Sequence, residues 1–292
     1  MRAMRIVRKL TDICEEIPHP VLTIGNFDGI HLGHQSIFRW IIEKARAMNG
    51  TSGVFTFHPH PLKLLCPSRA PLLITTIEEK VELLEKLGIQ MLICLNFTPE
   101  LARLNRKEFV EEVLWNKIGL RDLVVGHDFA FGRHRQGNIP YLRERGAELG
   151  FKVHTMKQVE INGTIVSSSL IRQLILEGNV ERVAQLLGHP YSLGGEIQSI
   201  DKPHGKNEQF TLGFRPQKKL LPPSGFYTVK VTGGRQSVVE NSCCRVLWEP
   251  GSPLHLYFSD LPPYLGEGKV LRLIFLQKLR QEEYYTPLLN AK

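Results

Sequence analysis

The stretch from Thr23 to His34 constrains the fold most, because an apolar strand, a glycine-bearing turn and a helix start follow one another directly. Val21–Ile24 is short and apolar, which predicts a buried parallel strand that ends at Gly25. Ser36–Met48 has apolar residues at helical spacing and predicts an amphipathic helix. A strand, a turn and a helix N-terminus in succession present backbone N–H groups to an anion. The stretch therefore predicts a phosphate site.

His31 and His34 stand three residues apart where this helix begins, so we expect both rings on one side of the bound anion. An imidazole can donate to a phosphoryl oxygen and stabilise developing charge without acting as a nucleophile. The alternative is a tight turn in which the glycines serve only the backbone conformation. The sequence contains neither G-x-x-x-x-G-K-[ST] nor G-x-G-x-x-G here, which excludes a Walker-type loop and a dinucleotide fingerprint.

Strands and helices alternate over the first part of the chain, which predicts an α/β fold with a doubly wound parallel sheet. The predicted strands are 21–24, 52–57, 90–97, 123–126 and 151–154, and the predicted helices are 36–48, 77–87, 107–117 and 141–149. Ligands of such sheets bind beyond the carboxyl ends of the strands. Three polar blocks follow strand ends as this rule requires: His58–Pro61, Gly126–Gly132 and Ser167–Arg172.

Ser167 and Ser168 predict another helix start, since a serine hydroxyl caps free N–H groups and an apolar periodic run continues to Gly178. Arg172 is expected in or near the first turn, where the helix dipole disfavours a cation by about 0.3–1 kcal/mol. A bound anion would reverse this penalty. Without one, the arginine reaches solvent or a nearby carboxylate, and its removal is expected to leave the helix neutral or more stable.

A domain boundary is predicted after the helix Asn179–Leu187, which has an asparagine cap and a glycine stop. Beyond it, short apolar runs are broken by Gly and Pro, which predicts a small β-barrel or meander. Val270–Leu276 is a late strand of this part, with a C-terminal helix after it. We therefore expect an α/β domain over residues 1–187 and a β-barrel domain over residues 188–292.

The net charge of +8 and the pI of 9.3 raise the question of nucleic-acid binding. The basic residues are spread along the chain, and no aromatic residues interleave with them as a stacking platform requires. We expect no nucleic-acid partner. Five cysteines without C-x-x-C spacing indicate neither a disulfide framework nor a zinc ribbon, and no apolar run has membrane-spanning length. These features predict a cytoplasmic protein without a membrane partner.

Four blocks resemble the prokaryotic bifunctional riboflavin kinase/FMN adenylyltransferase (FAD synthetase) family. The stretch from Gly25 to His34 is similar to its nucleotidyltransferase loop, G-x-F-D-G-x-H-x-G-H. The other blocks, in order, are Thr56–Pro61, which resembles T-F-x-P-H-P, Val125–Gly132, which resembles V-G-x-[DN]-F-x-F-G, and Ser167–Arg172, which resembles S-S-T-x-I-R with serine for threonine. The resemblance covers residues 1 to about 190.

This resemblance implies an FMN adenylyltransferase that converts ATP and FMN to FAD and pyrophosphate with Mg²⁺. It implies that Arg172 and the serines face the two histidines across the triphosphate. The implied catalytic residues are His31, His34 and Arg172. The implied ATP-binding residues are Gly25, Asn26, Phe27, Asp28, His31, Gly33, His34, Ser167, Ser168 and Arg172. The implied flavin-binding residues are Phe57, Pro59, Asp128, Phe129 and Phe131, although aromatic side chains are more often core, and the metal ligands are unknown.

The second part departs from the family's riboflavin kinase pattern. Thr211–Phe214 keeps the start of L-G-F-P-T-A-N, but Arg215–Lys218 replaces its last four residues, and Pro253 stands where a catalytic glutamate belongs. We expect the kinase fold with little kinase chemistry, although Arg215, Lys218 and Lys219 leave an anion site as an alternative. Two other functions stay open: a fully bifunctional enzyme and a flavin-binding regulatory module without catalysis.

Overall fold

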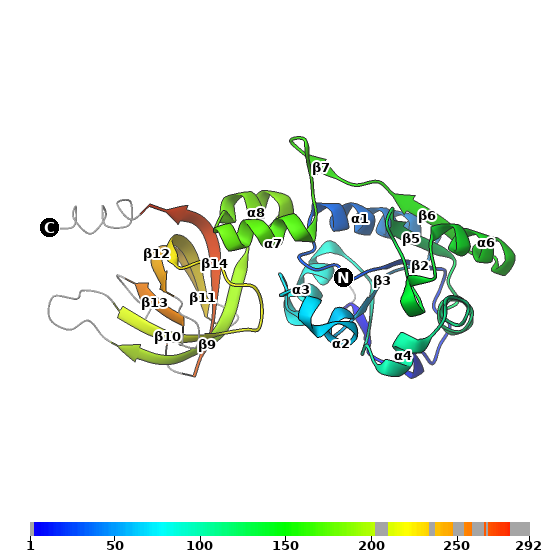
Figure 1. The fold of residues 1–292 in the computed structure, drawn as a ribbon, viewed down its shortest axis with the longest axis horizontal. Helices are drawn as coiled ribbons and strands as arrows, with labels where there is room; N and C mark the ends of the chain where they lie inside the picture. Colours follow the sequence, from blue (N-terminus) through cyan, green and yellow to red (C-terminus); the bar gives the residue numbers. More distant parts are fainter. Residues whose placement is uncertain are drawn as a thin grey trace. The chain divides into compact units, whose positions relative to one another are not determined.

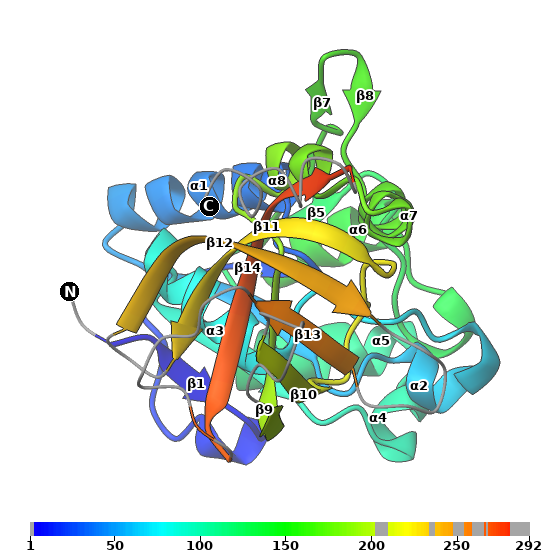
Figure 2. The same ribbon diagram turned by 90° about the vertical axis from the view of Figure 1, so that its left-hand side faces the viewer.

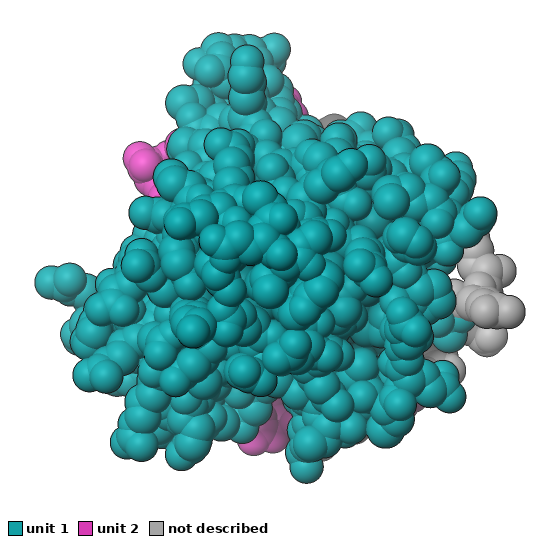
Figure 3. Space-filling model, turned by 90° about the vertical axis from the view of Figure 1, so that its right-hand side faces the viewer, with its two compact units in different colours: residues 1–71, 77–166 teal, residues 72–76, 167–292 magenta. Residues whose placement is uncertain are grey.

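The computed structural model describes residues 3–201, 210–233, 237–247, 254–258, 266 and 268–280. The chain divides into two compact units, which Figures 1 and 3 show. Unit 1 holds residues 1–71 and 77–166, and unit 2 holds residues 72–76 and 167–292. The helices after Ser167 thus group with the barrel by packing, and the predicted domain boundary at residue 187 stays a prediction.

Unit 1 is built on a parallel sheet of six strands, which confirms the predicted α/β class. The strand order is β1-β4-β3-β2-β5-β6. Their bounds are Arg5–Val7 (β1), Pro20–Ile24 (β2), Thr51–Phe57 (β3), Met91–Leu95 (β4), Asp122–Gly126 (β5) and Lys152–Met156 (β6). The strand β1 was not predicted, because three residues among charged neighbours carry too little pattern.

Helices cover both faces of this sheet (Figure 1). The α-helices are Leu32–Ala47 (α1), Leu62–Leu65 (α2), Ile77–Leu87 (α3), Pro99–Arg103 (α4), Arg106–Glu108 (α5) and Ile139–Leu149 (α6). A π-helix, η3, spans Phe109–Lys117, and 3-10 turns lie at Leu10–Asp12 (η1), Pro67–Arg69 (η2) and Arg133–Arg135 (η4). The predicted helix 107–117 is therefore present with π geometry over most of its length.

The core separates into two clusters because successive side chains of a strand point to opposite faces. Val54 and Leu92 pack with α1 and α3 on one face, the α1 face. Phe55 and Ile93 pack with η3 and α6 on the other, the η3 face. Burial on both faces explains why these strands are continuous apolar runs rather than alternating ones.

The chain reverses its direction of travel across the sheet between β2 and β5. From β2 it moves through β3 to β4, and it then crosses back to β5 on the other side of β2. In open α/β sheets, ligands bind at such a switch point, beyond the carboxyl ends of the strands. The loops after β2, β3 and β5 leave neighbouring strands at this edge, where the sequence predicts the site.

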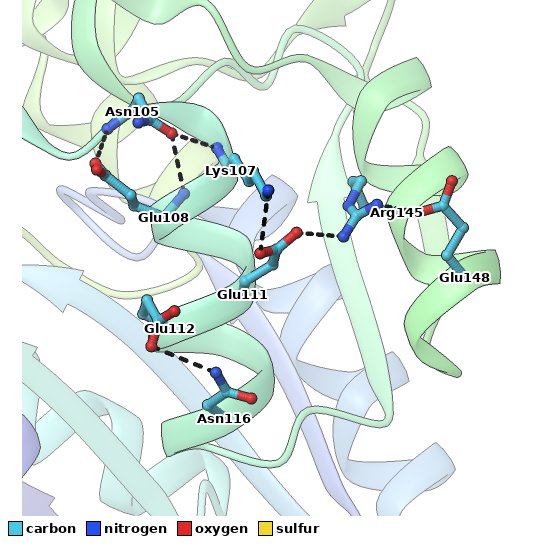
Figure 4. Close-up of polar contacts among 8 residues, drawn as sticks. All are labelled: Asn105, Lys107, Glu108, Glu111, Glu112, Asn116, Arg145 and Glu148. Carbon is cyan, nitrogen blue, oxygen red and sulfur yellow. Dashed lines mark hydrogen bonds and ion pairs between the residues drawn. The ribbon is translucent and has the colours of Figure 1, made fainter.

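An ion pair joins η3 to α6, and further polar contacts lie within single helices (Figure 4). Arg145 of α6 bonds to Glu111 of η3 and to Glu148 of its own helix. Asn105 caps the start of α5, its side chain accepting from the amides of Lys107 and Glu108 at 2.8 and 3.0 Å. These contacts lie on the η3 face and fix the helices there.

Unit 2 contains two helices and a closed antiparallel barrel, which confirms the predicted small β-barrel. The barrel order is β10-β13-β12-β11-β14-β9. The elements are Ser168–Glu177 (α7), Val180–Leu187 (α8), Ser192–Asp201 (β9), Phe210–Pro216 (β10), Gly225–Gly233 (β11), Ser237–Leu247 (β12), Leu254–Phe258 (β13) and Val270–Leu279 (β14). The expected C-terminal helix lies outside the described residues. Within them, no helix has the length and apolarity to cross a membrane.

Two further features differ from the sequence expectation. The helix α1 begins at Leu32 rather than Ser36, so that His31 itself is its N-cap. A hairpin of Glu160–Ile161 (β7) and Thr164–Ile165 (β8) projects from unit 1 (Figure 2). Its turn residues Asn162 and Gly163 both have positive φ, as a two-residue hairpin turn requires.

Candidate active site

The loop between β2 and α1, residues 25–31, has an unusual backbone. Phe27 and Ile30 adopt φ of 46° and 44°, and Gly29 adopts 86°. A non-glycine residue held in this left-handed region costs on the order of 1–3 kcal/mol. Phe27, Asp28 and Ile30 are nevertheless buried. Such a strained backbone persists only where the surrounding packing and hydrogen bonds hold it in place, and it is typical of functional loops.

Gly25 is required by close packing within the same loop. The Phe27 ring folds back over it, so that a Cβ at this position would lie 2.9 Å from Cζ of Phe27. The amide of Gly25 donates to the carbonyl of Phe55 at 3.1 Å and continues the pairing of β2 with β3 for one residue. The turn therefore leaves the sheet directly at its carboxyl edge.

His31 caps α1 through its ring. Its Nδ1 accepts a hydrogen bond from the backbone N–H of His34 at 3.3 Å. A nitrogen that accepts carries no proton, so the neutral ring holds its proton on Nε2. The cap thus selects one tautomer and makes Nε2–H the ring's remaining donor.

The rings of His31 and His34 stack, with centroids 3.5 Å apart and an interplanar angle of 19°. The rings of Phe27 and His34 pack edge to face, with centroids 5.2 Å apart. A Cβ on Gly33 would lie 3.1 Å from the His31 ring, so glycine leaves room for the stack. The structure therefore brings together both predicted catalytic histidines and two predicted ATP-binding residues, Phe27 and Gly33.

Both histidines are neutral at pH 7. Burial lowers the pKa of His31 to about 4, although nearby Asp28 opposes this shift. Burial also lowers the pKa of His34 well below its ordinary value, and the charge of His31 adds to the effect. The buried Nδ1 of His34 has no hydrogen-bond partner within the described part of the chain. An unpaired polar atom of this kind is costly, which favours a ligand or water at the site.

We expect acid to destabilise the protein through His31. Its folded pKa of about 4 lies below its unfolded value of 6.5, so between these two pH values only the unfolded chain takes up the proton. The free energy of unfolding therefore falls as pH drops through this window, by about 2 kcal/mol for this group at pH 5. Urea unfolding at pH 7.5 and 5 measures the effect. His31→Gln should show a smaller loss than the wild type, and an equal loss would contradict the buried neutral ring.

Lys80 is a polar residue of this site that the sequence analysis missed. It lies on α3, is buried, and its Nζ donates to the backbone carbonyl of Asn26 at 2.6 Å. Burial lowers the pKa of Lys80, while the carboxylate of Asp28 acts in the opposite direction. The signal was present, because Lys80 occupies a core-facing position of an amphipathic helix, between Ile77 and Leu84.

The loops after β3 and β5 carry the residues predicted to bind flavin. The ring of Phe57 contacts that of Phe97 at 5.3 Å, and Phe129 stacks on Phe131 at 5.6 Å. Phe57 and Phe129 are partly buried against the η3 face, whereas Phe131 belongs to its core. Pro59 is half-buried and Asp128 is exposed. The structure thus brings aromatic side chains to the η3 face, while the histidine loop packs on the α1 face.

One contact joins the β3 loop to the histidine loop. The side-chain nitrogen of Asn26 lies 3.0 Å from Nε2 of His60, and Nδ1 of His60 accepts from the Leu62 amide. His60 therefore supports a loop rather than a metal. Within the described residues, no three His, Cys, Asp or Glu side chains gather as a metal site.

Ser167, Ser168 and Arg172 belong to unit 2. Ser167 caps α7 by accepting from the Leu170 amide at 3.3 Å, as predicted. Arg172 is the fifth residue of the helix, one position beyond its first turn, and its Nε donates to the carbonyl of Leu72 at 2.9 Å. That these residues face the histidines across a triphosphate stays a prediction.

A family model and the curated relatives agree on one family. A family model described as FAD synthetase matches residues 14–170. Two curated relatives are the bifunctional riboflavin kinase/FMN adenylyltransferases of Buchnera aphidicola (strain APS) and Pseudomonas fluorescens, which are 30% and 31% identical to this chain. The alignments span 97% and 98% of this chain and 92% of each relative. The Escherichia coli K12 enzyme is 32% identical over 80% of the chain and 74% of its own length. A Streptococcus pneumoniae structure described as a macrolide-efflux protein matches with a TM-score of 0.80 and 25% identity, over 100% of this chain and 97% of its own.

Proposed function

The chain belongs to the FAD synthetase family, and from that premise we propose how its residues make FAD. The protein is an FMN adenylyltransferase, which transfers AMP from ATP to FMN. The observation that carries the assignment to a site is the buried histidine pair at the N-terminus of α1, with Nε2–H of His31 fixed as a donor. A neutral donor beside a helix N-terminus suits a phosphoryl group whose charge increases in the transition state.

In the proposed reaction, a phosphate oxygen of FMN attacks the α-phosphorus of ATP. A new P–O bond forms as the bond between the α-phosphorus and the bridging oxygen breaks, and pyrophosphate leaves with the electron pair. No proton needs to move to either histidine. His31 and His34 stabilise charge, and backbone amides of the loop beyond Gly25 orient the phosphates.

We propose that Mg²⁺ enters with ATP. Nucleotide-bound Mg²⁺ keeps several waters and is held mainly by phosphate oxygens with few protein ligands. The ion would supply charge neutralisation at the triphosphate.

The flavin is proposed to lie beyond β3 and β5. Phe57 and Phe129 are partly exposed aromatic side chains suited to an isoalloxazine ring, and Pro59 borders it. Asp128 is exposed and offers a polar contact. Phe131 supports Phe129 from the core.

Arg172 is proposed to bind the β- and γ-phosphates together with Ser167 and Ser168. We expect Arg172→Ala to raise the KM for ATP about tenfold, the value of one lost charge-assisted contact. The variant should also lose about 1 kcal/mol of stability, because Arg172 donates to the Leu72 carbonyl. The expected loss replaces the sequence-based expectation of a neutral or stabilising change.

Thermal shift with and without ATP tests this role of Arg172. The variant should show a smaller ATP-induced shift than the wild type. Arg172→Lys keeps the charge and should retain part of it. A full ATP-induced shift in Arg172→Ala would remove the arginine from the phosphate site.

A second candidate function is the fully bifunctional enzyme. The curated relatives that span most of this chain are named for both activities, and unit 2 is a closed barrel. The sequence of the barrel argues against it, since Arg215–Lys218 replaces the expected P-T-A-N segment.

Incubation of the purified protein with FMN, ATP and Mg²⁺, followed by separation of the flavins, tests the main proposal. We expect FAD and pyrophosphate in equal amounts. Binding of FMN without ATP-dependent FAD formation would instead establish a flavin-binding module.

A further inference from the structure

We propose that Lys80 is a positioning residue for adenylyl transfer, which holds the Asn26–Phe27 peptide so that the N–H of Phe27 points to the nucleotide phosphates. This inference rests on the proposed function of the histidine loop. It assigns a role to a buried cation that the mechanism above does not use.

The carbonyl of Asn26 receives two donors from separate elements. Nζ of Lys80, on α3, lies 2.6 Å from it, and Oγ1 of Thr56, on β3, lies 3.5 Å from it. The lysine contact is charge-assisted and short, which makes it the stronger of the two. Both donor residues are buried, so the carbonyl is held toward the interior.

A trans peptide sends its C=O and N–H in opposite directions. The Asn26–Phe27 bond is not among the cis peptides, of which the described residues contain His58–Pro59. With the Asn26 oxygen held inward by Lys80, the Phe27 N–H points away from Lys80. Phe27 is also where the backbone enters the left-handed region, at φ 46°. Lys80 therefore acts at one of the two non-glycine residues of the loop that adopt the left-handed conformation, Phe27 and Ile30.

A lysine at this position is expensive for stability alone. Lys80 is 8% exposed, whereas Leu84, one turn further along the same face, is fully buried and apolar. Burying an ammonium costs several kcal/mol unless it is paired, and an apolar side chain there would often be neutral or stabilising. The nearby carboxylate of Asp28 favours the charged lysine. The charges of Lys80 and Asp28 offset each other's cost of burial. What Lys80 then adds to the loop is a strong hydrogen-bond donor to the Asn26 carbonyl.

Steady-state kinetics of FAD formation by Lys80→Met test the proposal. Methionine keeps an unbranched stem but has no donor and no charge. Misplacement of the groups that orient the phosphates lowers the rate on the order of 100-fold, and we expect kcat/KM for ATP to fall by about this factor. FMN affinity, followed by flavin fluorescence, should stay within about twofold, because the proposed flavin residues lie on the η3 face.

Two controls separate positioning from general damage. Leu84→Ala removes core volume from the same helix face and should lower stability with little change in kcat/KM. Lys86→Met removes an exposed lysine charge from the same helix and should change neither. A loss of activity in Leu84→Ala equal to that in Lys80→Met would overturn the proposal.

A double-mutant cycle with Asp28→Asn distinguishes the peptide contact from charge balance. Lys80→Met alone leaves the Asp28 carboxylate buried without its cation and should lower Tm, whereas the double variant should recover much of that loss. If Lys80 holds the peptide, Lys80→Met lowers kcat/KM by a similar factor in the Asp28→Asn background. If Lys80→Met does not lower kcat/KM in the Asp28→Asn background, Lys80 acts only through the charge of Asp28 and the proposal is wrong. Failure of the wild type to form FAD would overturn the proposed function instead.

Discussion

His31→Ala is expected to lower kcat for adenylyl transfer by about 30- to 1000-fold, which corresponds to about 2–4 kcal/mol for a lost preorganised donor. The reason is that the His34 amide occupies Nδ1 and leaves Nε2–H fixed as the donor of a buried neutral ring. An interaction made mainly in the transition state affects kcat rather than ground-state binding. FMN affinity should therefore change little.

The same substitution also removes the N-cap of α1, which costs about 0.5–2 kcal/mol of stability. His31→Asn separates the two effects, because asparagine is a good N-cap but cannot place a donor where the imidazole Nε2 does. We expect His31→Asn to recover most of the Tm lost in His31→Ala and to remain as slow. Normal turnover in a folded His31→Asn variant would exclude the ring from the mechanism.

Features that depend on local pattern were predicted from the sequence. Ser167 and Asn179 cap α7 and α8, and Gly178 and Gly188 end these helices with positive φ. The strands β2 to β5 are short, mainly apolar runs, and their burial on both faces makes them visible in a single sequence. The barrel was predicted as a class, but its strand order was not, because that order depends on pairing between distant segments.

Features that depend on tertiary contacts were not predicted. The capping of α1 by an imidazole is uncommon, and a helix start at Leu32 depends on His31 folding back onto His34. The burial of Lys80 depends on the backbone carbonyl of Asn26, which lies 54 positions earlier in the sequence. The β7–β8 hairpin is a different kind of omission, because its Asn162-Gly163 turn is a strong local signal that the sequence analysis did not use.

The barrel of unit 2 has the fold expected for a kinase module, whereas its sequence departs from the kinase pattern that the family resemblance implies. Gly213 of β10 lies opposite His255 of β13, so the two family-like segments are neighbours. At the end of β10, Pro216 stands where the family pattern has threonine, and Pro253 lies outside the described residues. A proline at either position supplies neither a side-chain oxygen nor a backbone N–H.

The basic residues of this region are also mostly engaged. Arg215 forms an ion pair with Glu196 at 2.7 Å, and the ammonium of Lys219 lies 4.6 Å from the centroid of the Tyr191 ring in the interior. Lys218 is exposed. The alternative that these three side chains hold an anion together would need Arg215 and Lys219 to leave these contacts, so the altered segment offers little to neutralise a triphosphate.

We therefore expect riboflavin phosphorylation at least about 100-fold slower than FMN adenylylation by the same protein, the lower end of what a missing general base costs. The measurement supplies riboflavin and ATP in one reaction and FMN and ATP in another, and separates the flavins at matched enzyme concentration. FAD should form rapidly only where FMN is supplied. Gln217→Asn, which changes the altered segment conservatively, serves as a matched control and should leave both rates unchanged. Rapid conversion of riboflavin to FMN by the wild type would instead show that the barrel uses other catalytic groups and that the enzyme is bifunctional.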